Sequence, residues 1–304
     1  MLRDSRLDAN AELRAVKILS SSLIDVSNAA AASLPGEKTL DSSKRSAVTR
    51  LYLAADQRDG GEHVFEAARL AERSLLSACD HARAFGQLIR TEKRPATALI
   101  TLARGGLEAA GRSLWLSDDL DVEAHLHRII SMLYADLRHD VGVDDALESS
   151  TTGELVDAAE RREFYLSELT RLGLPPAKKP ELTAMVQNLV AKMSLPFDKE
   201  RLYSVYSGIA HGQLGGLNAF LVPGEGLSAP RLRAPLPVIT AASVLLMTAI
   251  QLTADQYITW LGGAGAARPR LLEAVNRVAE KTLGLPAVAF ASDPPANSRS
   301  GAST

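Results

Sequence analysis

Hydrophobic residues recur at helical spacing through most of this chain. The clearest stretch is residues 62–92, where apolar side chains follow one another at steps of four and three: Val64, Ala68, Ala71, Leu75, Ala78, Ala82, Phe85 and Ile89. This spacing places them on one narrow stripe of a helix. Because several of them are small, the stripe predicts close contact with a neighbouring helix, and we interpret it as packing within a bundle.

The same periodicity, interrupted by glycine and proline, predicts the other helices. They are expected at residues 6–33, 41–57, 95–117, 121–140, 152–172, 181–193, 198–211, 238–260 and 268–284. Asp41 is the expected N-cap of the second of these. The sequence 173–176, Gly-Leu-Pro-Pro, ends the helix at 152–172, and Gly212 is a left-handed C-terminal residue for the helix at 198–211.

Strand signals are few. Residues 212–237 are dense in glycine and proline, and 217–222 and 231–233 are candidate extended pieces. We therefore predict an all-α, multi-helix bundle with one irregular loop or short β-hairpin inserted near 212–237. The expected organisation is an N-terminal helical pair over 1–61, a main helical bundle over 62–284 and a disordered tail over 285–304.

An uncharged apolar run covers residues 234–254, which is long enough to span a bilayer. Threonine, serine and glutamine lie within it, and prolines lie near its start. These residues favour a central helix buried among other helices over a membrane span. No stable membrane association is expected.

Composition narrows the class of protein. Hydrophobic residues make up 46% of the chain but aromatic residues only 5%, so the core has to be built mainly from aliphatic side chains. The 34 basic and 36 acidic residues give a net charge of −2, which argues against a general nucleic-acid coat. The single cysteine, Cys79, excludes an intramolecular disulfide, and we expect a cytoplasmic protein.

A first polar stripe lies on the helix at 95–117. Arg104, Glu108 and Arg112 are spaced i, i+4, i+8, so that Glu108 is placed to bridge both arginines. The surrounding residues are strongly apolar, and arginines that face the interior are costly unless paired. The stripe is therefore either a solvated row of ion pairs or a binding site for an anion.

A second stripe has the same spacing, with Tyr203, Ser207 and His211. His211 falls at a helix C-terminus, where the helix dipole favours the imidazolium form. Two interpretations stay open: an acid–base histidine with a hydroxyl partner, or a core histidine hydrogen-bonded to Ser207.

The sequence gives less support to a serine hydrolase or a metal site. A serine hydrolase needs a third residue that orients the histidine and an oxyanion hole, and no Gly-x-Ser-x-Gly motif is present. Asp136, His139 and Asp140 share a helix face, but the Asp-x-x-His pair occurs once, whereas a di-iron bundle uses two such helices. His125 and His127 point to nearly opposite sides of a helix. No metal and no cofactor are expected.

The two stripes together resemble a family of uncharacterised, all-helical bacterial proteins. That family carries an Arg/Glu helix followed at a distance by a Ser-x3-His-Gly helix, as do the residues Arg104, Glu108, Arg112, Trp115, Tyr203, Ser207, His211 and Gly212 here. The resemblance covers roughly residues 64–260 and brings no settled activity with it.

A more distant resemblance is to HEPN domains, helical bundles of which many are metal-independent ribonucleases in toxin and phage-defence systems. Their site is an arginine followed after four to six residues by a histidine, usually doubled by dimerisation. Here the one match is Arg58 with His63, across a predicted turn. Alternatively, Arg104 or Arg112 holds a phosphate and His211 moves a proton, if the two stripes meet.

Two functional hypotheses follow. The favoured one is a binding or regulatory module whose internal polar stripes either bind a small anionic ligand or simply specify packing. Its candidate binding residues are Arg104, Glu108, Arg112, Trp115 and Tyr203. The alternative is a HEPN-like ribonuclease or nucleotide-directed effector in bacterial defence, with His211, Ser207 and Arg104 as catalytic residues. The alternative implies an RNA partner and a homodimer formed along the apolar seam of 62–92.

Overall fold

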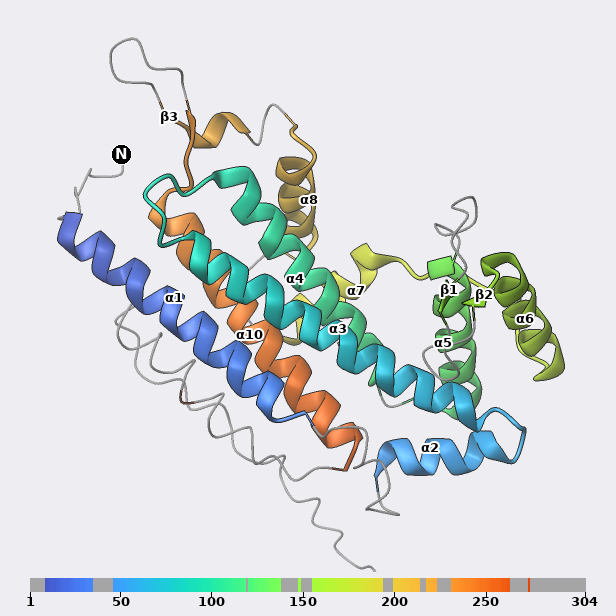
Figure 1. Ribbon diagram of the computed structural model, residues 1–304. Helices are drawn as coiled ribbons and strands as arrows, with labels where there is room; N and C mark the ends of the chain where they lie inside the picture. The colour runs from blue at the N-terminus through green and yellow to red at the C-terminus, as the bar shows by residue number, and fades with distance from the viewer. Residues whose placement is uncertain are drawn as a thin grey trace, which may run out of the picture.

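The structure is a computed structural model (Figure 1). It describes residues 9–34, 46–118, 120–137, 147–148, 155–193, 199–213, 217–222, 231–262 and 273. The predicted helix at 268–284, apart from residue 273, and the predicted tail at 285–304 lie outside these residues, as do His139 and Asp140.

The chain is all-α with small β-hairpins. Its helices are α1 (Ala9–Ala32), α2 (Ala47–Asp56), α3 (Gly61–Leu88), α4 (Ala96–Leu116), α5 (Val122–Asp136), α6 (Ala158–Arg171), α7 (Leu182–Lys192), α8 (Lys199–Ala210) and α10 (Leu236–Trp260). Strand β3 (Leu221–Val222) pairs antiparallel with β4 (Arg231–Leu232), as predicted for 212–237. A short 3-10 helix, Asn218–Phe220, precedes β3 where extended chain was expected.

Several helix ends agree with the prediction and others do not. Gly212 has a φ value of 73°, which confirms the left-handed residue predicted to close α8. Helix α6 ends before Gly173, as predicted, and Gly173 is also left-handed, with a φ value of 68°. The N-cap of α2 is Ser46, whose side chain accepts a hydrogen bond from the Thr49 N–H, so the assignment of Asp41 was wrong. Ser46 is favoured because a short hydroxyl side chain reaches the free N–H groups of the first turn.

The predicted start of α6 at residue 152 was also wrong. Asp157 caps this helix, accepting hydrogen bonds from the N–H groups of Ala159 and Glu160. Immediately before it, β2 (Leu155–Val156) pairs antiparallel with β1 (Leu147–Glu148), a second hairpin that the sequence pattern did not predict. Two-residue strands are too short for an alternating pattern to be detected.

The α3–α4 hairpin is the centre of the fold (Figure 1). Helices α1 and α10 pack on one side of it, and α7 and α8 pack against α4. Helices α2, α5 and α6 gather near the N-terminal end of α3. Buried residues of α1 and α2 belong to the same hydrophobic core as those of the later helices, so this core has no break at the expected domain boundary near residue 61.

The apolar seam of α3 lies inside this core. Every seam residue, from Val64 to Ile89, is at most 1% exposed. The interpretation of the seam as packing within the bundle is thus confirmed. Because its side chains already contact other helices of the same chain, the seam is not open for the dimer that the ribonuclease hypothesis implied.

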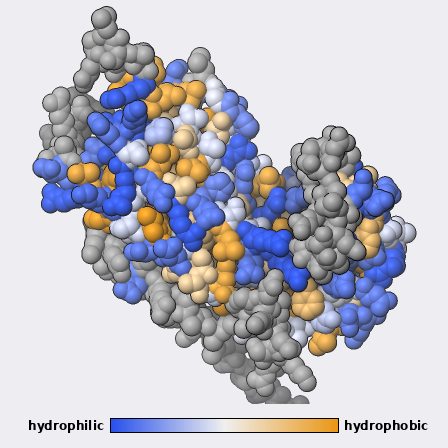
Figure 2. Space-filling model, in the orientation of Figure 1, coloured by the Kyte–Doolittle hydropathy of each residue, from blue (hydrophilic) through white to orange (hydrophobic). Residues whose placement is uncertain are grey.

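Helix α10 is long and apolar enough to cross a membrane, the one described helix with this property. It packs against α1, α3 and α4, and its polar residues contact those helices. Thr253 donates to the carbonyl of Ala110 at 3.4 Å, and Tyr257 to that of Ala68 at 3.2 Å. On the face seen in Figure 2, hydrophilic and hydrophobic residues are interspersed over the described part of the surface. The hydrogen bonds from Thr253 and Tyr257 to neighbouring helices are those of a core helix.

Candidate functional site

The two polar stripes meet in space. Arg104 Nη1 lies 2.9 Å from His211 Nε2, although 107 positions separate the residues in sequence. Arg104 Nε donates to Glu108 Oε1 at 2.7 Å, and the Tyr203 hydroxyl donates to the same oxygen at 2.8 Å. The guanidinium carbon also lies 5.6 Å from the centre of the Tyr203 ring. Helices α4 and α8 are therefore joined by a four-residue polar cluster, Arg104, Glu108, Tyr203 and His211.

The electrostatic environment shifts the pKa values of two members of this cluster, Arg104 and Tyr203. Partial burial by itself lowers the pKa of Arg104, but the hydrogen bond and charge of Glu108 outweigh burial and raise that pKa. Burial and the hydrogen bond to Glu108 both raise the pKa of Tyr203, so its phenol stays protonated and donates.

His211 differs from both sequence interpretations. It is exposed, one residue beyond the end of α8, and so is not a core histidine. Because a guanidinium only donates, Nε2 of His211 is the acceptor in its contact with Arg104. Within the described structure no hydrogen bond joins the Ser207 hydroxyl to His211; the backbone carbonyl of Ser207 accepts from the His211 N–H instead. The proposed Ser207–His211 pair is thus not formed.

Arg112 and Trp115 contact residues outside this cluster. Arg112 donates from Nη1 and Nη2 to the two carboxylate oxygens of Asp136 on α5, at 3.0 and 3.3 Å. The expected bridge from Glu108 to Arg112 is absent from the described contacts, because the Arg112 guanidinium is directed to Asp136 instead. Trp115 lies under the guanidinium of Arg128, 4.4 Å from ring centre to carbon, and makes no described contact with the four-residue cluster.

Beside the cluster an open pocket of about 340 Å³ lies between α3 and α4. Its lining from α3 is polar: Arg73, Ser74, Ser77 and His81. Helix α4 contributes Gly105, Glu108, Ala109 and Arg112, and Leu182 of α7 borders it. Glu108 and Arg112 thus belong to the first predicted stripe and to the pocket.

The α3 side of the pocket carries unsatisfied donors. Among the described residues, the side chains of Arg73, Ser74, Ser77 and His81 form no hydrogen bond or ion pair with protein; Arg73 and Ser77 are exposed, His81 is half-buried and Ser74 is buried. Gly105 makes room for the histidine ring, since a Cβ at that position would lie 2.7 Å from His81 Cε1. The pocket therefore presents one guanidinium, two hydroxyls and an imidazole that have no protein partner there.

These α3 residues were not predicted as site residues from the sequence. Arg73, Ser77 and His81 have the same i, i+4, i+8 spacing that singled out the stripes on α4 and α8. They lie on a polar face of α3, the same helix that carries the apolar seam. The repeated spacing was the available signal.

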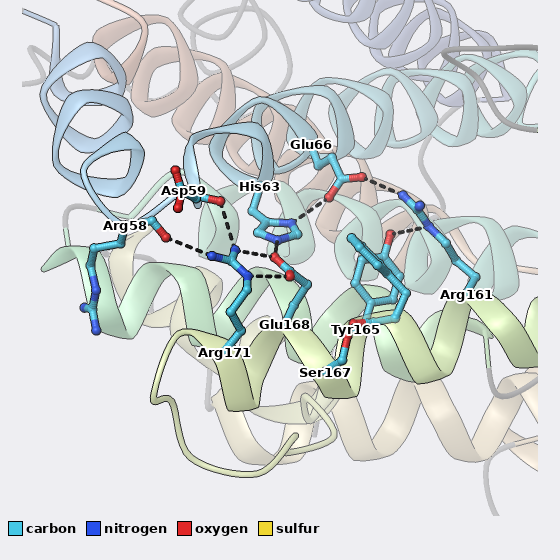
Figure 3. Close-up of polar contacts among 10 residues, drawn as sticks. Arg58, Asp59, His63, Glu66, Arg161, Tyr165, Ser167, Glu168 and Arg171 are labelled. Carbon is cyan, nitrogen blue, oxygen red and sulfur yellow. Dashed lines mark hydrogen bonds and ion pairs between the residues drawn. The ribbon is translucent and has the colours of Figure 1, made fainter.

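A second polar cluster links α3 to α6 (Figure 3). His63 is 4% exposed, and its two ring nitrogens contact carboxylates: Nδ1 lies 3.0 Å from Glu66 Oε2 and Nε2 lies 2.8 Å from Glu168 Oε2. Arg171 donates twice to Glu168, each time at 2.7 Å, and Arg161 donates to Glu66 at 3.1 Å. A ring held by carboxylates at both nitrogens is an imidazolium.

The pKa values agree with this ion-pair cluster. Burial by itself lowers the pKa of His63, but the hydrogen bonds and charges of Glu66 and Glu168 outweigh it and raise that pKa. The hydrogen bonds from Arg171 and then from His63 lower the pKa of Glu168 to about 2 against the opposing effect of burial. These pKa shifts favour the charged forms of His63 and Glu168, and the resulting ion pairs attach α6 to α3.

The HEPN-type match falls in this second cluster. The Arg58 guanidinium donates to Glu123 and to the Leu172 carbonyl, each at 2.8 Å, and makes no described contact with His63 (Figure 3). His63 itself is buried and has both nitrogens engaged. Neither side chain is placed to act on a substrate as the arginine and histidine of a nuclease pair do.

The remaining candidate ligands lie apart. His125 is 1% exposed and stacks near the ring of Trp260, whereas His127 Nε2 lies 3.0 Å from the Pro176 carbonyl. In the part of the chain that the structure describes, no three histidine, cysteine or acidic side chains gather into a metal site. Cys79 is buried, and burial raises the pKa of its thiol to about 11.

Comparison with protein-family models, with curated protein sequences and with solved structures found no match for this chain. The geometry of its own residues is therefore the ground for a functional proposal.

Proposed function

We propose that this protein binds a small anionic ligand in the α3–α4 pocket. The observation that carries the proposal is the row of unsatisfied donors on α3, facing Arg112 across a volume of about 340 Å³. Pockets of this size accommodate small metabolites. Arg73 and Ser77 are exposed and accessible to a ligand from solvent, whereas buried Ser74 and half-buried His81 need water or a ligand as their hydrogen-bond partner.

Charge selects an anion. Arg73 forms no ion pair among the described residues, and Arg112 keeps N–H groups beyond the two that bind Asp136. Guanidinium groups suit carboxylate and phosphate because their donors form a planar fork. The hydroxyls of Ser74 and Ser77 lie on the same wall and supply neutral donors.

Calorimetric titration with inorganic phosphate tests this proposal. We expect wild-type protein to bind phosphate and Arg73→Ala to bind it at least about tenfold more weakly, a change typical of one lost charge-assisted contact. Arg90→Ala removes an exposed arginine outside the pocket and is the matched control, with wild-type affinity. Ala109→Leu fills the pocket without removing a donor and should also weaken binding.

Two outcomes would contradict the proposal. One is that phosphate does not bind to folded wild-type protein. The other is that phosphate binds equally to wild type, Arg73→Ala and Ala109→Leu, since the binding site would then lie elsewhere.

A second candidate function, metal-independent RNA cleavage, is favoured by one contact. Arg104 Nη1 and His211 Nε2 lie 2.9 Å apart, and His211 is exposed. A guanidinium that binds a phosphodiester next to a neutral imidazole that accepts a proton is a minimal cleavage pair. The described residues supply no second histidine or oxyanion donor to this pair.

The test is incubation with total RNA in EDTA. Cleavage by wild type that is lost in both Arg104→Ala and His211→Ala, with circular dichroism unchanged, would establish the nuclease. If wild type left RNA intact and bound phosphate in the pocket, RNA cleavage would be rejected and ligand binding would be the one function kept.

A further inference from the structure

The α3–α4 pocket has two chemically different ends. Helices α3 and α4 form an antiparallel hairpin (Figure 1), and His81 lies against Gly105. Along the axis of α3, Arg73 lies eight residues, or about 12 Å, from His81. Along the axis of α4, Arg112 lies seven residues, or about 10 Å, from Gly105 in the same direction. Arg73 and Arg112 therefore lie at about the same level, at the opposite end from His81.

The carboxylate of Glu108 lies between these levels. Its Oε1 already accepts from Arg104 at 2.7 Å and from Tyr203 at 2.8 Å. Its Oε2 has no hydrogen-bond partner among the described residues, although Glu108 lines the pocket and its side chain is only 22% exposed. A half-buried carboxylate oxygen repels an anion and attracts a donor such as a hydroxyl.

The two ends of the pocket therefore suit a ligand that carries both an anionic group and a hydrogen-bond donor. An anionic group suits the end with Arg73 and Arg112, and a hydrogen-bond donor suits Glu108, about 6 Å farther along α4. His81 offers a further partner for a hydroxyl, since an imidazole both donates and accepts when neutral. Two guanidinium groups and two serine hydroxyls supply more donors than the two oxygens of a carboxylate use, whereas a phosphate has an additional acceptor oxygen.

Resting on the proposed anion-binding function, we infer that the ligand is a small phosphorylated polyol, such as a sugar phosphate. Its phosphate binds at Arg73 and Arg112, and a hydroxyl donates to Glu108 Oε2. Inorganic phosphate fills only the basic end of the pocket, and an unphosphorylated sugar only the end with Glu108 and His81.

The experiment compares ribose 5-phosphate, inorganic phosphate, ribose and alanine by calorimetric titration. We expect ribose 5-phosphate to bind at least about tenfold more tightly than phosphate, since it adds a hydrogen bond to a charged acceptor. Ribose and alanine should bind more weakly than phosphate. Glu108→Gln, which keeps an acceptor for Arg104 and Tyr203 but replaces the other oxygen with an amide, should remove the advantage of ribose 5-phosphate over phosphate.

The controls separate this inference from the proposed function. Glu163→Gln changes an exposed carboxylate on α6 and should keep the tenfold preference. Equal affinities for phosphate and ribose 5-phosphate, both weakened by Arg73→Ala, would overturn the polyol inference and keep the anion site. Tighter binding of alanine would overturn it in favour of a zwitterionic ligand, and no binding of any anion would overturn both proposals.

Discussion

At the scale of single residues, two buried histidines of this protein have opposite electrostatic environments. His63 contacts a carboxylate at each ring nitrogen, and its pKa is raised. His125 is equally buried, but its ring nitrogens have no hydrogen-bond partner among the described residues. Burial first, and then the charge of Arg128, lower the pKa of His125 to about 4. One imidazole is therefore stabilised as a cation and the other as a neutral ring.

Removing His63 should weaken the attachment of α6. In His63→Ala, Glu66 and Glu168 lose a buried partner, and we expect the free energy of unfolding at pH 6 to fall by about 3 kcal/mol. The stabilisation from the raised pKa is complete below pH 6.5 and is lost as pH rises through the folded-state pKa above it. Urea titrations from pH 6 to pH 10 measure both effects.

His127→Ala is the matched control for that prediction. Its ring contacts a surface carbonyl, so the variant should show the same alkaline loss of stability as wild type. If His63→Ala kept the full alkaline loss, His63 would not be the titrating group.

The lowered pKa of His125 predicts the opposite pH dependence of the free energy of unfolding. Its folded-state pKa of about 4 lies below its ordinary value of 6.5, so the stability that it contributes is present above pH 6.5 and lost as pH falls toward 4. The shift corresponds to about 3 kcal/mol over that range. His125→Leu should lose less stability than wild type between pH 7 and pH 4, as measured by urea unfolding at each pH. An unchanged acid slope would show that His125 is not the cause.

At the scale of the elements, glycine sets how closely the central helices approach. A Cβ at Gly111 of α4 would lie 3.2 Å from the backbone carbon of Met185 in α7, and one at Gly86 of α3 would lie 3.2 Å from the Ser20 carbonyl oxygen in α1. Backbone atoms cannot move aside as a flexible side chain does. The close contact predicted from the small residues of 62–92 therefore extends to the faces of α3 and α4 that meet α1 and α7.

Gly111→Ala should consequently destabilise the protein. Overpacking against α7 costs about 1–3 kcal/mol, which exceeds the gain of about 1 kcal/mol from the better helix propensity of alanine. Gly208→Ala on α8 is the matched control, because its Cβ would meet only the side chain of exposed Gln213. Thermal unfolding should show a lower midpoint for Gly111→Ala and an equal or higher one for Gly208→Ala; equal midpoints for both variants would refute the packing argument.

At the scale of the whole molecule, the fold surrounds α10 with other helices. Leu246 is 0% exposed and lies over Gly106 of α4, where an added Cβ would approach its Cδ2 to 2.6 Å. A leucine in such a place contributes to stability through burial and packing, whereas a leucine that faces lipid loses little on truncation.

Leu246→Ala therefore distinguishes a core helix from a membrane helix. We expect its free energy of unfolding to fall by about 3 kcal/mol in detergent-free buffer, and the wild-type protein to remain in the supernatant of a high-speed spin. Recovery of the wild type only in the membrane pellet would contradict this prediction.

The sequence by itself determined the helices that the structure describes and which residues share a helix face, but not the β1–β2 hairpin or every helix end. Periodicity located the helices, and Gly173 and Gly212 marked two of their ends, because these signals depend on neighbours within a few residues. The same local rule placed Arg104 with Glu108 and Tyr203 with His211. The same spacing also places Arg73, Ser77 and His81 on one face of α3, although these residues were not predicted as a site.

Only the tertiary structure decided which faces meet. It paired Arg104 with His211, gave Glu108 to Tyr203 rather than to Arg112, and turned Arg112 toward Asp136 on α5. It also left the donors of α3 facing a pocket. The physical reason is that helical spacing fixes directions within one helix, whereas the pairing of two helices is the sum of many small packing contacts between residues far apart in the chain.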